Sequence, residues 1–79
     1  MWTIKYCGMW NYYPQAASLS AQINLHHYET CEIEEGDNGQ FEIFKSGKSI
    51  LSKKDHGDFF TIEDVKKKLE EIGESFYGE

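Results

Sequence analysis

The chain has 79 residues, with eight lysines, no arginine and 14 acidic residues, so its formal net charge at pH 7 is −6. A chain this short buries only about 60% of its unfolded surface, which excludes large multilayered enzymes and predicts one small domain over residues 1–79. The acidic charge argues against a nucleic-acid partner, because counterion release needs a basic surface. No apolar run is long enough to span a membrane, and no signal-peptide pattern begins the sequence, so we expect a cytoplasmic protein without a membrane partner.

The first third of the sequence predicts a strand, a loop and a helix. Residues 2–6 alternate apolar and polar side chains, which is the period of a strand. Residues 11–23 carry apolar side chains at helical spacing, with Asn11 as the expected N-cap and Pro14 in the first turn, where its missing N–H removes no intrahelical bond. Residues 7–10 connect the two elements.

The middle of the sequence predicts a strand followed by a tight turn. Residues 28–35 alternate, with Cys31 and Ile33 on one face and acidic side chains on the other. Residues 36–39 form a cluster of Gly, Asp and Asn, which is typical of a turn. We therefore expect a second strand with one solvated face.

Residues 40–53 predict a hairpin around the two-residue connection Ser46-Gly47. The strands are expected at residues 40–45 and 48–53. Their expected register places Ile43 opposite Ile50 and Phe44 opposite Ser49. A slip by one residue would lose the match between the two isoleucines.

The last segment predicts a capped helix. Thr61 is the expected N-cap, Asp64 completes a capping box, and Phe60 and Val65 have the spacing of a hydrophobic staple. The apolar stripe of this helix comprises Ile62, Val65, Leu69, Ile72 and Phe76. Lysines 66–68 fall beside or opposite this stripe, so we interpret them as a solvated face.

Cys7 is the first candidate for chemistry in the resulting α/β sandwich. It ends a predicted strand and precedes a helix N-terminus, where unpaired N–H groups and the helix dipole favour a thiolate. The alternative is that Cys7 is a small buried apolar residue, which is the usual fate of a free cysteine. Two cysteines are too few for a secreted disulfide scaffold, so we expect reduced thiols.

Several segments resemble the selenoprotein W-like (Rdx; SelT/SelW/SelH) family, and together they cover nearly the whole chain. They are residues 6–12, 16–17, 32–43, 47–48, 52–54 and 57–59. The resemblance implies a thioredoxin-like α/β fold with the element order β-α-β-β-β-α and a four-stranded mixed sheet of strand order 2-1-3-4. Residues 36–39 would then cross over the first strand instead of closing a hairpin.

That fold would bring two loops to the edge of the sheet where Cys7 lies. The residues expected to flank the thiol are Asp37, Asn38, Gln40, His56, Asp58 and Phe59. Of these, His56 titrates near neutral pH and could assist Cys7. The alternative is an exposed loop histidine with no role.

The sequence departs from the family at the redox loop. Members typically carry Cys-x-x-Cys or Cys-x-x-selenocysteine, whereas this loop is Cys7-Gly8-Met9-Trp10. Without a second redox atom, Cys7 cannot cycle through an internal disulfide across the loop. Three interpretations remain open. Cys7 acts as a single thiol on glutathione or a thiol protein; the activity is lost and Trp10 contacts a protein partner; or Trp10 stands at a selenocysteine codon, since UGA and UGG differ by one base.

Other candidates are weaker. Cys31 could pair with Cys7 only if the two came within bonding distance, and we interpret it as a buried free thiol. His26, His27, Cys31 and His56 lack the spacing of a zinc site. We therefore expect neither a metal nor a cofactor. The acids Glu32, Glu34, Glu35 and Asp37 are interpreted as a solvated face, and their negative potential would oppose a thiolate at Cys7.

Overall fold

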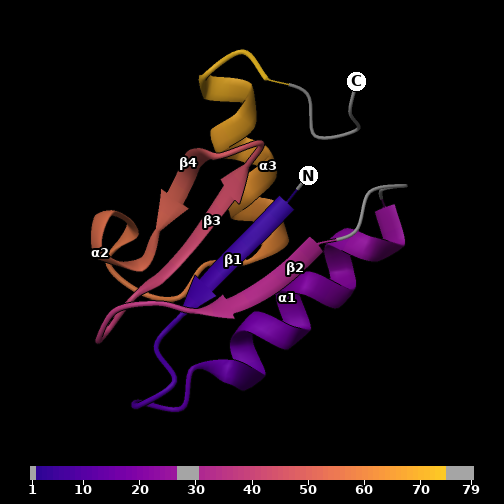
Figure 1. Cartoon of the computed structure of the whole chain (residues 1–79). Coiled ribbons are helices and arrows are strands. Elements are labelled where there is room, and N and C mark those ends of the chain that lie inside the picture. Colours follow the sequence, from indigo (N-terminus) through magenta and orange to yellow (C-terminus); the bar gives the residue numbers. More distant parts are fainter. Residues whose placement is uncertain (1, 27–30, 75–79) are drawn as a thin grey trace.

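The computed structural model describes residues 2–26 and 31–74. Its elements, in chain order, are β1 (Trp2–Tyr6), α1 (Tyr13–His26), β2 (Cys31–Glu35), β3 (Phe41–Lys45), β4 (Lys48–Ser52), α2 (Lys53–His56) and α3 (Ile62–Glu71) (Figure 1). The expected strands and the two long helices are confirmed, and α2 is an addition. The start of the predicted strand 28–35, before Cys31, lies outside the described residues.

The four strands form one mixed sheet in the order β2-β1-β3-β4. Strand β1 runs parallel to β2 and antiparallel to β3, and β3 runs antiparallel to β4. Because β1 lies between β2 and β3, residues 36–40 must pass across the end of β1. The crossover implied by the resemblance is therefore confirmed, and the end of β1 is brought against residues 36–40.

The hydrophobic core lies on one face of this sheet. Apolar side chains alternate along the central strands, so that Trp2, Ile4 and Ile43 are fully buried. Helices α1 and α3 contact each other and cover this face with the stripes that their spacing predicted. The buried apolar residues of the two helices are Ala16, Leu19, Ile23, Ile62, Val65 and Leu69. Burying each large side chain stabilises the fold by about 1.5–3 kcal/mol.

The expected register of the β3–β4 hairpin is half correct. Phe44 pairs with Ser49, but Ile43 pairs with Leu51 instead of Ile50, because a β-bulge adds one residue to β4. In a regular strand Ile50 and Leu51 would point to opposite faces. The bulge allows both apolar side chains to pack against the core. Strand alternation predicts only one of the two on that face, so the bulge could not be predicted from it.

Helix α1 begins at Tyr13, so the prediction of Asn11 as its N-cap is wrong. Asn11 has a φ of 59° and its N–H donates to the Gly8 carbonyl at 3.2 Å. The N–H of Tyr12 donates to the Cys7 carbonyl at 3.1 Å. These bonds form a compact turn between β1 and α1. Asn11 suits this turn because asparagine adopts the left-handed backbone conformation more readily than most residues. Pro14 lies in the first turn of α1, as expected.

The predicted strand 48–53 ends at Ser52, because a short helix follows. The Ser52 hydroxyl accepts a hydrogen bond from the N–H of Asp55 at 3.2 Å and caps α2. Gly57, with a φ of 99°, then ends that helix. This helix turns the chain from the edge of the sheet toward α3.

The capping box of α3 is confirmed. Thr61 Oγ1 accepts from the Asp64 N–H at 3.3 Å, and Asp64 Oδ2 accepts from the Thr61 N–H at 2.8 Å. The helix ends at Glu71, earlier than its apolar stripe suggested. Ile72 therefore lies at the C-cap and is partly exposed, and Phe76 lies outside the described residues.

Candidate functional site

Cys7 directly follows β1, and its side chain is only 1% exposed. The backbone N–H of Trp10 donates to Cys7 Sγ at 3.3 Å. The turn bonds of Gly8 with Asn11 and of Cys7 with Tyr12 hold this N–H in place. The loop therefore holds one backbone donor against the sulfur of Cys7.

The side chains that follow Cys7 in its loop are exposed. Met9 and Trp10 are 80% and 59% exposed, whereas Cys7 is buried. The Trp10 ring packs edge-on against Tyr12, with centroids 6.0 Å apart. The same ring lies against Gly39, since a Cβ at Gly39 would stand 3.0 Å from Trp10 Cζ3. Because Cys7 is only 1% exposed, a reagent reaches its sulfur only after a local movement of the structure.

The crossover after β2 adds negative charge beside this loop. The N–H of Gly36 donates to the Tyr6 carbonyl at 2.8 Å, which holds the crossover against the end of β1. The Glu35 carboxylate occupies the space where a side chain at Gly8 would lie. The structure thus places an acid next to the loop, in the surroundings that we expected to oppose a thiolate.

Three of the residues expected to flank the thiol lie in this crossover. The N–H of Gln40 donates to the Asp37 carbonyl at 3.1 Å, and Gln40 Oε1 accepts from the Asp37 N–H at 2.8 Å. Asn38 is exposed in the same turn. The turn reaches the Cys7 loop through Gly39 and Trp10. Sequence reasoning missed Gly39, although its place in a Gly-Asp-Asn cluster was a signal for unusual backbone.

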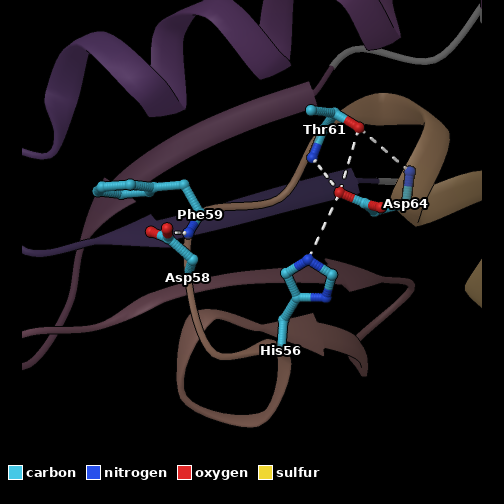
Figure 2. Close-up of polar contacts among 5 residues, drawn as sticks. All are labelled: His56, Asp58, Phe59, Thr61 and Asp64. Carbon is cyan, nitrogen blue, oxygen red and sulfur yellow. Dashed lines mark hydrogen bonds and ion pairs between the residues drawn. The ribbon is translucent and has the colours of Figure 1, made fainter.

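The loop before α3 reaches the Cys7 loop through Phe59. Its ring packs edge-on against Tyr12 and Phe41, with centroid distances of 4.7 and 5.1 Å. The Phe59 N–H donates to Asp58 Oδ1 at 2.7 Å, which orients the loop (Figure 2). Lys53 Nζ lies 5.7 and 5.3 Å from the Tyr12 and Phe59 ring centroids. These aromatic contacts, and the lysine over them, were not expected from sequence.

His56 is engaged with α3. Figure 2 shows its ring directed at Asp64, with Nε2 3.6 Å from Asp64 Oδ2. The ring also packs edge-on against Phe60 at 6.2 Å. Hydrogen bonding by the Thr61 N–H lowers the pKa of Asp64 most strongly, and the Thr61 hydroxyl, His56 and Lys67 lower it further. Within the described residues, the contacts of His56 thus lie at the N-terminus of α3.

Cys31 is a second buried free thiol. It stands opposite Trp2 in the parallel register, so it lies about 16 Å from Cys7 at 3.3 Å per residue, which is too far for a disulfide. Its N–H donates to Asn24 Oδ1 at 2.9 Å, and its carbonyl accepts from the Ser20 hydroxyl at 2.8 Å. Burial raises the pKa of the Cys31 thiol to about 11.

Two cavities lie away from the thiol. One, of about 280 Å³, opens between α1 and the segment before α3, and another, of about 340 Å³, lies between β4, α2 and α3. Cys7 lines neither. Across residues 2–26 and 31–74, no three His, Cys, Asp or Glu side chains gather as metal ligands. In the same residues, no helix has the length and apolar character to span a membrane.

Comparisons with known proteins agree on this architecture. A crystal structure of a selenoprotein W-related protein from Vibrio cholerae is 25% identical, with a TM-score of 0.76 over 90% of this chain and 92% of that chain. A structure from Bordetella parapertussis, 17% identical, has a TM-score of 0.76 over 90% of this chain and 94% of that one and shows the same fold. No curated protein sequence matches the chain. The Rdx family model matches residues 2–71. The chain therefore belongs to the Rdx family, and its fold is the thioredoxin-like fold of the selenoprotein W-related proteins.

Proposed function

We propose that this protein acts in thiol redox chemistry, with Cys7 as a single thiol that forms mixed disulfides with glutathione or with a thiol-bearing protein. The observation that carries the proposal is the N–H of Trp10, which donates to Cys7 Sγ at 3.3 Å. Because this donor belongs to the backbone, it does not depend on the side chain at position 10. Membership of a family with redox-type relatives supports the same conclusion.

The proposed reaction is a thiol–disulfide exchange that needs no other oxidant. The Cys7 thiolate attacks one sulfur of oxidised glutathione, forms a Cys7–glutathione disulfide and releases one glutathione thiolate. A second thiolate, from glutathione or a protein, then attacks the glutathione sulfur and releases Cys7. The disulfide passes to the incoming thiol, and Cys7 returns unchanged. An external thiol is required because position 10 holds tryptophan.

We propose a cytoplasmic location, because two cysteines are too few for a secreted disulfide scaffold. Residues 1–79 are proposed to form one thioredoxin-like domain. No cofactor is needed for the exchange, since the sulfur atoms carry all of its chemistry. A neutral Cys31 thiol takes no part, because burial raises its pKa to about 11.

The test uses two variants that each keep one thiol, Cys31→Ala and Cys7→Ala. Each folded protein is incubated with oxidised glutathione and weighed by intact-mass spectrometry. We expect one glutathione adduct on Cys31→Ala, removed by reduced glutathione, and none on Cys7→Ala. The proposal fails if Cys31→Ala stays unmodified when folded but is modified in urea, because the thiol would then be reactive only in the unfolded chain.

A second candidate function is a redox-inactive protein-binding module. It is favoured by the exposure of Met9 and Trp10 above a buried thiol, since tryptophan is frequent among residues that dominate binding energy. A Cys7→Ser variant separates the two functions. If the Cys7→Ser variant still captures the partner, the result supports the binding module. If capture is lost both in this variant and when the parent protein is kept under reducing conditions, the result supports a role of the thiol.

The codon for Trp10 tests the third interpretation. A UGA codon with a selenocysteine insertion element in the native gene would make the protein a thiol–selenol oxidoreductase. A UGG codon would establish tryptophan at this position and leave Cys7 as the redox atom of the loop.

A further inference from the structure

The loop over Cys7 presents an apolar surface to solvent. Met9 and Trp10 are largely exposed, and Tyr13, at the start of α1, is 50% exposed. The Tyr13 ring packs edge-on against Tyr6 with centroids 5.6 Å apart, and the Trp10 ring rests on Gly39. The exposed aromatic rings thus have a fixed backing, which lowers the entropy lost when a partner covers them.

Unpaired negative charge lies beside this apolar surface. Residues 31–40 contain four acids and no lysine. The four are Glu32, Glu34, Glu35 and Asp37. The Glu35 carboxylate lies over Gly8, and Asp37 belongs to the turn whose Gly39 backs Trp10. Among the described residues, no lysine forms an ion pair with any of these four acids.

Three acids elsewhere in the described chain, Glu63, Glu71 and Glu74, form ion pairs with lysines. Glu63 pairs with Lys66 at 4.0 Å and Glu71 with Lys68 at 3.9 Å along α3. Lys5, which stands opposite Glu34 in the register of β1 and β2, holds its ammonium 5.4 Å from the Phe44 ring centroid. Among the described residues, Glu35 and Asp37 thus place negative charge without an ion-pair partner beside the exposed apolar loop.

We propose that this surface, formed by Met9, Trp10, Tyr13, Glu35 and Asp37, docks a segment of a partner protein in which apolar side chains are flanked by lysine or arginine. The apolar side chains cover Met9 and Trp10, and the basic side chains meet Glu35 and Asp37. Opposite charges speed the encounter and set its orientation, while the buried aromatic contact supplies most of the affinity. The inference rests on the proposed function in one respect, because a docked partner would lie beside the Cys7 loop.

Trp10 itself reports on docking. Trp2 is fully buried, so a change in tryptophan emission on adding a ligand comes from Trp10. Cys7→Ser protein is titrated with a synthetic peptide of alternating lysine and leucine, with a peptide in which glutamate replaces lysine, and with one in which serine replaces leucine. We expect saturable binding of the first peptide, about tenfold weaker binding of the other two, and loss of affinity with added salt.

Matched variants assign the surface. Glu35→Gln/Asp37→Asn is compared with Glu63→Gln/Glu71→Gln, which removes the same charge from α3. Trp10→Ala is compared by calorimetry with Leu25→Ala, which removes another strongly exposed apolar residue, 82% exposed on α1. We expect the first variant of each pair to lose about fivefold or more in affinity and the second to bind normally. Circular dichroism checks that each variant is folded.

Two results would overturn the docking surface. One is the absence of saturable binding by the basic apolar peptide. The other is an equal loss of affinity in both double variants, which would show that the attraction depends only on the net charge of the chain. Neither result bears on the glutathione test of Cys7. A failure of the glutathione test likewise does not change peptide binding by the Cys7→Ser protein. The two proposals therefore fail separately.

Discussion

The indole ring of Trp10 lies against the backbone of Gly39, so closely that a Cβ on Gly39 would stand 3.0 Å from Trp10 Cζ3. Gly39 has a φ of 77°, in the left-handed region that glycine adopts without strain. The contact joins the loop over Cys7 to the crossover between β2 and β3. The conformations of the Cys7 loop and of the crossover are therefore linked.

Gly39→Ala should loosen this contact. We expect a loss of about 1–2 kcal/mol in the free energy of unfolding from the positive φ, with a further loss as Trp10 moves. Gly47→Ala is the control, since Gly47 has a φ of 83° and no neighbour within 4 Å of its added Cβ. Urea unfolding measures the two costs. Alkylation of Cys7 in a Cys31→Ala background should also speed up in Gly39→Ala, and equal costs with unchanged alkylation would show that the contact does not control access.

Trp10→Cys should restore an internal redox pair. The loop already directs the residue 10 N–H at Cys7 Sγ from 3.3 Å, so the backbone of position 10 lies close to the first sulfur. We expect a disulfide between residues 7 and 10 that mild reductants open, measured as the loss of two free thiols in a Cys31→Ala background. The single-thiol parent serves as control. Persistence of both thiols under oxidising conditions would show that this loop has lost the geometry of a redox pair.

The capping box of α3 should make stability depend on acidic pH. Hydrogen bonding by Thr61 lowers the pKa of Asp64 from its ordinary value of 3.8. The resulting stabilisation is present above pH 3.8 and is lost as the pH falls through the lower, folded-state pKa. Asp64→Asn should therefore be less stable than the parent at neutral pH, and the difference should shrink in acid. Urea midpoints across this range test it, with Glu63→Gln as a control in the same turn. A difference that is constant with pH would contradict the prediction.

Cys31 should make stability fall at alkaline pH. Burial raises the pKa of its thiol from 9.0 to about 11, so the thiol ionises in the unfolded chain before it ionises in the folded one. The stabilisation from the neutral thiol is complete below pH 9 and is lost as the pH rises to about 11. Over this range the free energy of unfolding should fall by about 2–3 kcal/mol relative to that of Cys31→Ala. Unfolding of the two proteins at matched pH removes the effect of lysine titration. Parallel stability curves would show that Cys31 is more hydrated than its surroundings indicate.

Several elements could be predicted because their signals are local. The capping box needs only Thr61 and Asp64, three residues apart, and the stripes of α1 and α3 need only helical spacing. The bulge at Ile50 and the cap of α2 at Ser52 were missed. Both respond to a neighbouring element, since the bulge lets β4 pack two apolar side chains on the core, and α2 turns the chain toward α3.

The sequence by itself determined that the chain is small and acidic, that Cys7 ends a strand, and that tryptophan occupies the position of a second redox residue. The tertiary structure decided that Cys7 is buried, that Glu35 lies beside Gly8 in the Cys7 loop, and that His56 contacts Asp64. The physical reason is that composition and spacing depend on neighbours along the chain, whereas burial and charge at Cys7 depend on segments that are brought together only when β1 takes its place between β2 and β3.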